Sequence, residues 1–365
     1  MNLFVNPEER RLRAFWRLLI QFAIFFIGGL LFGLFLSLSA LLIMLVSGLI
    51  PAAVATDPNA LATLINQKIV NFPFLQAVDA LFTLVLMLFT YWLAARYLDH
   101  RPLSDYGFHF GAHWWRDLAF GLLLGSLLMA LIFAAELTAG WLKVDGTFAS
   151  HDVGLPFWPG LIQAGVLYLC VGIYEEMLFR GYQLRNLAEG FNLPAVSPRA
   201  SLWTAYLLSS LIFGLLHLGN PHATAASTLN LIAAGLFLGL GYVLTGELAI
   251  YIGLHISWNF FQGNVFGFPV SGGVPPVSFL AIRQAGPNLW TGGAFGPEAG
   301  LVGLLALLLG GLLVLWWVRR THGDLRLQIR LAQYRPPAAG RAAAGNAQTD
   351  PLPTLRLKQG GSPSA

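Results

Sequence analysis

Eight long apolar stretches follow one another along the chain, separated by short polar or glycine- and proline-rich segments. A helix needs about 20 apolar residues to cross a membrane, and a helix satisfies its own backbone hydrogen bonds in lipid. Only 10% of the 365 residues are charged, against about 25% in soluble domains. We therefore predict an all-α polytopic membrane protein with about eight transmembrane helices. The predicted spans lie near residues 15–50, 75–97, 118–140, 160–187, 201–218, 228–245, 248–262 and 300–318.

The first stretch is too long for one straight crossing and too short for two. It begins with arginines and reaches Ala53-Val54-Ala55, which resembles a signal-peptide cleavage site. The apolar region of a signal peptide has about 7–15 residues, and this run is more than twice as long. We therefore predict one uncleaved helix that tilts or projects from the bilayer.

Positive charge is distributed unevenly between the two sides of the predicted bundle. Lys and Arg are enriched in the cytoplasmic segments of membrane proteins. With both termini in the cytoplasm, all but three of the 21 Lys and Arg residues fall on that side, the exceptions being Lys68, Lys143 and Arg283. We predict an integral membrane protein, in a bacterial plasma membrane, with both termini cytoplasmic. The chain shows no basic patch with interleaved aromatic residues of the kind that binds nucleic acid.

The apolar and polar segments divide the chain into four parts. We predict a cytoplasmic N-terminal segment (1–14), three N-terminal transmembrane helices (15–145), a membrane domain with the remaining helices (146–320) and a cytoplasmic, largely disordered tail (321–365). Residues 263–299 are rich in Gly and Pro and are expected to form a long external loop.

Three polar clusters interrupt the helices of the membrane domain. They are Glu175-Glu176 with Arg180, Phe213 with His217, and His255 with Asn259. A charged side chain in the hydrocarbon core costs about 2.5–3.5 kcal/mol on insertion scales, so its presence there indicates a function. In each cluster a spacing of four residues places the members on one helical face.

The clusters must also lie at the same depth to act together. Glu176 and Arg180 are expected to form an ion pair, which leaves the neighbouring Glu175 available because it lies about 100° further round the helix. Glu175 and His217 reach comparable heights only if the fourth helix continues to about residue 190, despite Gly181.

Together the three clusters carry a family resemblance. Glu175-Glu176-Met-Leu-Phe-Arg180, Phe213-Gly-Leu-Leu-His217 and His255-Ile-Ser-Trp-Asn259 resemble the EExxxR, FxxxH and HxxxN motifs of the CPBP (Abi) family, the intramembrane proteases related to type II CAAX prenyl endopeptidases. The resemblance covers about residues 160–265, within the predicted membrane domain.

The resemblance implies an endopeptidase that acts on a membrane-associated or lipidated protein or peptide, near its C-terminus. Glu175 with His217 would activate a water molecule, and His255 with Asn259 would stabilise the oxyanion. Glu176 and Arg180 would form a charged scaffold, and Phe213 a wall of the pocket. Membrane lipid and a peptide or protein substrate would be the partners.

Metal dependence stays open at this stage. Relatives in the family are commonly described as metalloproteases, and Glu175, His217 and His255 could together hold Zn²⁺. The chain has no HExxH motif, and its single cysteine excludes a cysteine-based zinc site. On chemistry, a glutamate protease without a metal is slightly favoured.

Other functions are compatible with buried charge. A lone Glu–Arg pair in such a protein would favour a transporter or a structural ion pair, and a non-catalytic immunity or scaffolding protein could retain the motifs. The absence of an internal repeat and the three motifs favour the hydrolase. For Asp79 and Glu136, a helix-end or interhelical hydrogen bond is expected.

Overall fold

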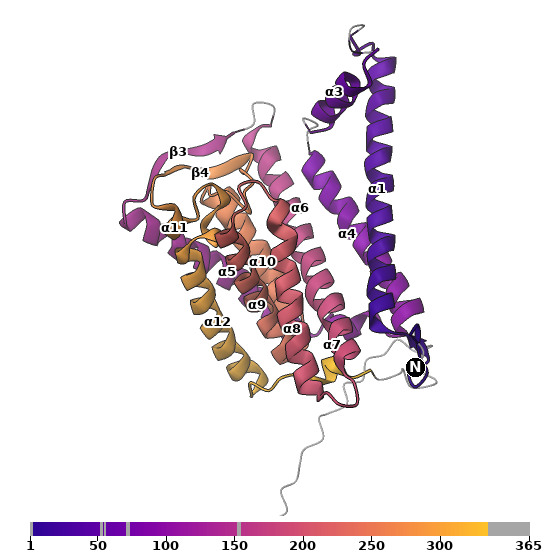
Figure 1. Cartoon of the computed structure of the whole chain (residues 1–365). Coiled ribbons are helices and arrows are strands. Elements are labelled where there is room, and N and C mark those ends of the chain that lie inside the picture. The colour runs from indigo at the N-terminus through magenta and orange to yellow at the C-terminus, as the bar shows by residue number, and fades with distance from the viewer. Residues whose placement is uncertain (1–2, 52–53, 55, 71–73, 152–154, 335–365) are drawn as a thin grey trace, which may run out of the picture.

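Helices account for most of the computed structural model, which describes residues 3–51, 54, 56–70, 74–151 and 155–334 (Figure 1). The fold class predicted from the apolar stretches is confirmed. The main helices are α1 (Ala14–Val46), α3 (Pro58–Val70), α4 (Leu75–Leu93), α5 (Ala112–Thr138), α6 (Phe157–Glu176), α7 (Arg185–Phe191), α8 (Pro198–Leu216), α9 (Ala225–Thr245), α10 (Ala249–Phe260), α11 (Asn288–Thr291) and α12 (Leu301–His322).

Seven helices in the described residues are long and apolar enough to cross a membrane. The seventh predicted span, 248–262, is not among them. It forms α10, which has only 12 residues and continues into a π-helical turn, η5 (Phe261–Val265). Nearly all of α10 is buried, because it lies in the centre of the bundle. Its apolar sequence therefore reflects burial within protein as well as membrane depth.

The helix α1 is longer than one straight crossing of a membrane requires. At 33 residues it is about 50 Å long, whereas the hydrocarbon core measures about 30 Å. Its N-terminal end lies beside the body, and its other end reaches, with α3, beyond the rest of the bundle (Figure 1). The stretch thus forms one long helix, and its tilt or projection relative to the bilayer stays a prediction.

The fourth predicted span is one continuous helix from Phe157 to Phe191. It comprises α6, a π-helical segment η3 (Met177–Leu184) and α7. Gly181 lies within η3 and does not interrupt the helix. The continuation to about residue 190, which the depth argument requires, is therefore present.

Small residues allow α10 to pack very closely against α5. A Cβ atom at Gly121 would lie 1.9 Å from the Ile250 carbonyl oxygen, and one at Gly253 would lie 2.3 Å from the Leu118 carbonyl oxygen. Such contacts between backbones are typical of helix packing in membranes. They fix the position of the helix that carries His255 and Asn259.

The predicted external loop contains a strand, so the prediction of loop throughout 263–299 is wrong. β4 (Val277–Gln284) pairs antiparallel with β3 (Leu142–Ser150), from Leu142 opposite Gln284 to Ser150 opposite Val277. The two strands are more than a hundred residues apart in sequence, so local composition does not reveal their pairing. The segment 268–276, named the cap here, precedes β4.

The first part of the predicted tail is ordered as well. After α12, residues 323–334 cross the end of the bundle near α7 and α8 (Figure 1) and include a 3₁₀ turn, η8 (Ile329–Ala332), in which Leu331 and Ala332 are buried. The amide of Gln328 donates to the Val243 carbonyl at 2.8 Å. Residues 335–365 lie outside the described residues, so the prediction of a largely disordered tail stays a prediction.

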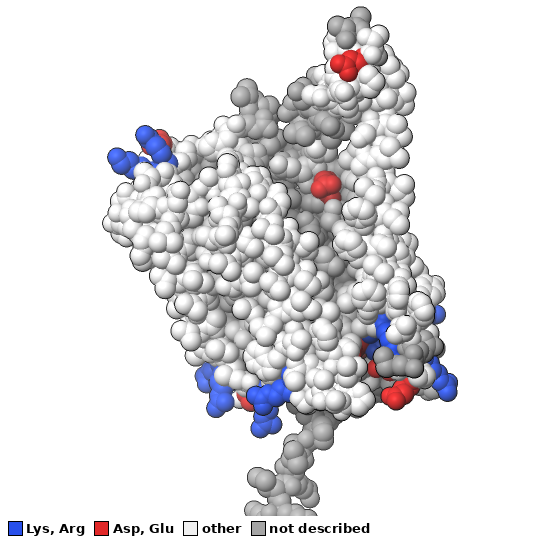
Figure 2. Space-filling model, viewed as in Figure 1, with Lys and Arg blue, Asp and Glu red and all other residues white. Residues whose placement is uncertain are grey.

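Charged side chains gather at the end of the molecule that holds the N-terminus, and most of the remaining surface in view is uncharged (Figure 2). At this end a short hairpin, β1 (Val5–Asn6) with β2 (Arg11–Leu12), precedes α1. A broad uncharged flank between charged ends is the surface expected of a chain that crosses a membrane.

We expect Gly121→Ala to destabilise the fold and Gly33→Ala to leave it unchanged or stabilise it. A Cβ at Gly33 meets nothing within 4 Å, so alanine there gains helix propensity. At Gly121 the added methyl forces α5 and α10 apart, with a loss of about 1–3 kcal/mol. Thermal unfolding in detergent measures both, and equal midpoints would contradict the packing argument.

Candidate functional site

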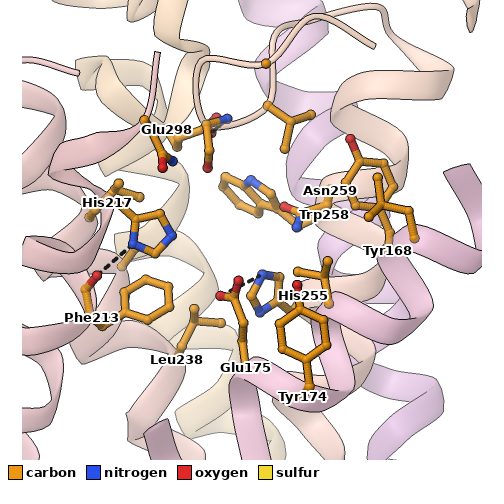
Figure 3. Close-up of a pocket in the computed structure, with 18 of the residues that line it drawn as sticks. Tyr168, Tyr174, Glu175, Phe213, His217, Leu238, His255, Trp258, Asn259 and Glu298 are labelled. Carbon is orange, nitrogen blue, oxygen red and sulfur yellow. Dashed lines mark hydrogen bonds and ion pairs between the residues drawn. The ribbon is translucent and has the colours of Figure 1, made fainter. Parts of the chain in front are cut away.

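A cavity of about 650 Å³ lies within the bundle between α4, α6, α8, α9 and α10, with the cap at one side. All four residues predicted to be catalytic line it, and Figure 3 shows them pointing into one space. The polar and aromatic side chains that line the cavity include Gln76, Asp79, Tyr168, Tyr174, Glu175, Phe213, His217, Asn220, His255, Trp258, Asn259, Asn264, Ser271 and Glu298.

The two adjacent glutamates of α6 point to different places. Glu175 lines the cavity, and its side chain is 20% exposed. Glu176 is fully buried behind the cavity wall. The angle of about 100° between neighbouring residues of a helix separates them, as the sequence predicts. The Glu175 carboxylate can therefore contact a ligand in the cavity, whereas the Glu176 carboxylate can contact only other groups of the protein.

His255 lies between these two carboxylates. Its Nδ1 donates to Glu176 Oε1 at 2.9 Å, and its Nε2 lies 4.0 Å from Glu175 Oε2. The carboxylate of Glu176 thus fixes the orientation of the ring, in the way that a carboxylate commonly orients a functional histidine. Nε2 is the ring nitrogen that remains for the cavity.

Arg180 neutralises the buried carboxylate, as the motif spacing predicts. Its Nη1 donates to Glu176 Oε1 at 3.0 Å, and its Nη2 donates to the Gly235 carbonyl on α9 at 3.3 Å. The guanidinium also lies 4.5 Å from the centre of the Phe213 ring, a favourable cation–π contact. Arg180 therefore joins α6, α8 and α9 below the cavity.

His217 is placed where α8 ends. It is the first residue after the last α-helical one, Leu216, and the 3₁₀ turn η4 (His217–Gly219) begins with it. Its Nδ1 donates to the Phe213 carbonyl at 2.7 Å, which leaves Nε2 as an acceptor. Phe213 lines the cavity and lies beside the His217 ring, as predicted.

The predicted pairing of Glu175 with His217 is indirect in this structure. Both side chains line the cavity, but the imidazole that contacts Glu175 among the described residues is that of His255. A water molecule in the cavity could bridge Glu175 and His217. Asn259 lies one helical turn beyond His255 and also lines the cavity, directly before the π-helical turn η5.

Glu298 is a site residue that the sequence analysis missed. It belongs to the 3₁₀ turn η7 (Pro297–Ala299) before α12, and it lies on the side of the cavity near His217 (Figure 3). It accepts hydrogen bonds from the Ser271 amide at 2.5 Å and from Gln262 Nε2. Burial raises the pKa of Glu298 to about 7. Contacts between distant segments bring Glu298 to the cavity, and these cannot be read from local sequence. The one signal in the sequence was an acidic residue just before the apolar stretch 300–318.

The other acidic residues set aside in the sequence have different surroundings. Glu136, near the C-terminal end of α5, accepts a hydrogen bond from Gln284 Nε2 of β4 at 2.7 Å, so it makes a hydrogen bond at a helix end, one of the two kinds expected. Asp79 lines the cavity instead. The expectation of a helix-end or interhelical hydrogen bond is not met for Asp79 among the described residues.

The proposed zinc ligands do not form a metal-binding group in this geometry. Among the described residues, no three His, Cys, Asp or Glu side chains come close enough together to hold a metal ion. Each histidine uses Nδ1 for a protein oxygen, that of Glu176 or of Phe213, which leaves Nε2 free, as in many metal-ligating histidines. It is the separation of the side chains, and not the histidine tautomers, that keeps Glu175, His217 and His255 from forming a zinc site as they stand.

Comparison with known proteins agrees with the motifs. Residues 156–261 match the model of a family described as type II CAAX prenyl endopeptidase Rce1-like. The resemblance predicted from the three motifs is confirmed. The chain is also 25% identical over 308 residues to the uncharacterized protein YyaK of Bacillus subtilis (strain 168), covering 80% of this chain and 90% of that protein. No solved structure matches the chain.

The matched segment contains α6, α8, α9 and α10, which carry all three motifs. With its seven long apolar helices, the chain is an integral membrane protein. At the level of the family, the match supports an endopeptidase of the membrane, similar to the CAAX proteases.

We expect Arg180→Met to be more destabilising than the double replacement Glu176→Gln with Arg180→Met. The single change leaves a buried carboxylate without its cation, which costs about 3–5 kcal/mol. The double change removes both charges, so its loss should be well below the sum of the two single losses. Thermal or denaturant unfolding of the four proteins measures this, and strict additivity would refute the coupling.

We expect the stability of the protein to fall as the pH rises towards neutrality, in part through Glu298. The pKa of this group is about 7 in the fold and about 4.3 when unfolded. Between these values the folded state binds more protons, so the free energy of unfolding decreases with increasing pH. Glu298→Gln removes this contribution. Melting curves from pH 5 to 8 should therefore fall more steeply for the wild type, and parallel trends would contradict the assignment.

Proposed function

We propose that the protein is an intramembrane endopeptidase that hydrolyses a peptide bond with water activated by Glu175 and His217. The observation that carries the proposal is the placement of Glu175. Its carboxylate faces the cavity beside the imidazole of His255, while the adjacent Glu176 is buried with Arg180. One glutamate is thus free to act as a base, and the other is committed to the scaffold.

The tautomers fixed by the protein suit the division of roles between the two histidines. His217 donates through Nδ1 to a carbonyl, so its Nε2 can accept a proton or a hydrogen bond from water. Glu175 and His217 would hold a water molecule between them, and Glu175 would take its proton as the hydroxide attacks the scissile carbonyl.

The oxyanion that forms then needs hydrogen-bond donors. The Asn259 amide can donate, and so can His255 Nε2 when the ring carries both protons between the two glutamates. The proton held by Glu175 would pass to the leaving nitrogen, which releases the amine. The products are a carboxylate and an amine, and the carboxylate of Glu175 is regenerated.

The substrate class follows from where the cavity lies. Its walls are helices of the membrane bundle, so a membrane-associated or lipidated protein or peptide is the proposed substrate, with membrane lipid as the surrounding partner. We propose cytoplasmic termini in a bacterial plasma membrane, because the arginines gather at the end of the bundle that holds the N-terminus.

We expect Glu175→Gln to lower the rate of peptide cleavage by about 10³-fold or more, because it removes the base. Asn259→Ala, which removes one oxyanion donor, should lower kcat by about 10²–10³-fold. The assay uses purified protein in nanodiscs and a library of quenched fluorescent membrane peptides.

Glu247→Gln is the matched control. Glu247 lies outside the cavity and pairs with His109 at 2.7 Å, where both side chains are partly exposed. If Glu175→Gln cleaves the peptides as fast as a folded and fully active control, the proposed mechanism is excluded. The transporter or scaffolding alternative would then be favoured.

A further inference from the structure

The residues of fixed charge type around the cavity are acidic, and His217 and His255 are the basic side chains among its described lining residues. Asp79, Glu175 and Glu298 line it, and none of the described lining residues is Lys or Arg. Arg180 lies behind the wall and is paired with Glu176. A ligand with an anionic group would meet repulsion here, and a ligand with a cationic group would meet attraction.

Asp79 differs from the other two carboxylates in having no partner. Glu298 accepts hydrogen bonds from Ser271 and Gln262, and Glu175 lies beside His255. Asp79 has no hydrogen bond or ion pair within the described part of the chain, although it belongs to the apolar span Leu75–Asp99, and it is exposed as well as lining the cavity. An ionisable residue at such a position is expensive and indicates a function.

A second acceptor on the cavity wall also lacks a partner. Asn264 is fully buried and lines the cavity. Its Nδ2 donates to the Val277 carbonyl at 2.7 Å, whereas its Oδ1 has no hydrogen-bond partner among the described residues. A buried acceptor without a donor is destabilising. A bound group that carries N–H donors would satisfy it.

The depth of Asp79 relative to Glu175 can be estimated from helix geometry. α4 and α6 run in the same direction, because Gln76 Oε1 accepts from Gln163 Nε2 at 3.5 Å near their starts, and Tyr91 lies near Gly181 at their ends. Asp79 is therefore level with about residue 166. Glu175 lies nine residues further along, or about 13 Å at 1.5 Å per residue.

The wall between these two levels is continuous. Leu167, Tyr168, Val171 and Tyr174 of α6 line the cavity from the level of Asp79 to that of Glu175. An extended peptide advances about 3.4 Å per residue, so a span of about 13 Å corresponds to about four residues.

Building on the proposed function, we propose that Asp79 is the binding partner of a lysine or arginine side chain of the substrate, about four residues from the bond that is cleaved. The substrate class is then a membrane peptide with a basic residue at a fixed distance from its cleavage site. Asn264 accepts a further hydrogen bond from the same bound segment.

The experiment scans one lysine through an otherwise apolar quenched fluorescent peptide, with norleucine at the same position as the neutral reference. Wild-type protein in nanodiscs should cleave the peptide with lysine about four residues from the cut up to about fivefold faster, in kcat/KM, than its norleucine counterpart. Asp79 is exposed, and an ion pair made by an exposed carboxylate has an effect of about this order. Asp79→Asn should bring that ratio to about one, and Asp79→Lys should favour glutamate over lysine.

Asp145→Asn is the matched control, because Asp145 is exposed, pairs with Arg283 on the β3–β4 sheet and does not line the cavity. It should keep the wild-type ratio. A flat lysine profile, or a ratio that Asp79→Asn leaves unchanged, would overturn the proposal.

A binding measurement separates this inference from the proposed activity. If no peptide is cleaved, the proposed function fails, and fluorescence anisotropy of the same labelled peptides then tests Asp79 alone. Tighter binding of the lysine peptide that Asp79→Asn abolishes would support the cation site without catalysis. Equal binding of the lysine and norleucine peptides would refute it.

Discussion

The contact on which the site depends is the double use of one buried oxygen. Glu176 Oε1 accepts from Arg180 Nη1 at 3.0 Å and from His255 Nδ1 at 2.9 Å. The pair of contacts ties α6 to α10 at the cavity wall. It also decides which nitrogen of His255 faces the cavity, and Arg180 compensates the charge that would otherwise make the buried carboxylate unstable. Because Glu176 already provides the carboxylate that Arg180 and His255 bind, the neighbouring Glu175 is free to face the cavity.

Charge elsewhere in the fold follows the same pattern of compensation. At the end of the molecule that holds the N-terminus, Arg11, Arg17 and Arg101 surround Glu189 and Asp99 in a buried network that joins the N-terminal segment, the end of α4 and α7. Breaking one such pair leaves an uncompensated charge, so the network fixes these segments relative to one another. Asp79, Glu175 and Glu298, which have no dedicated Lys or Arg partner among the described residues, line the cavity instead, which is why the cavity is where chemistry on a ligand is proposed.

The parts that the sequence predicts well are those set by local spacing. Four-residue spacing places Arg180 on Glu176, Phe213 beside His217 and the Glu175 carboxylate on another face. The parts that it misses depend on contacts between distant segments. The β3–β4 sheet, the ordered residues 323–334 and Glu298 at the cavity have local sequences that are typical of loops. For α10, high hydropathy marks burial among other helices, a condition that sequence alone does not distinguish from a lipid-facing span.

The chemistry proposed for the cavity also depends on its apolar side. Leu238, Leu254 and Leu307 line it together with the motif residues, and an apolar wall strengthens each hydrogen bond made in the cavity. Hydrolysis still requires water, and polar groups on the side of the cap, among them Ser271 and Glu298, offer hydrogen bonds to water. The close packing of α5 on α10 at Gly121 and Gly253 holds His255 and Asn259 in place in the cavity wall, between its apolar side and the cap. In the proposed mechanism, this rigid backbone contact would keep the two donors in place for the oxyanion, a charge that would exist only during the reaction.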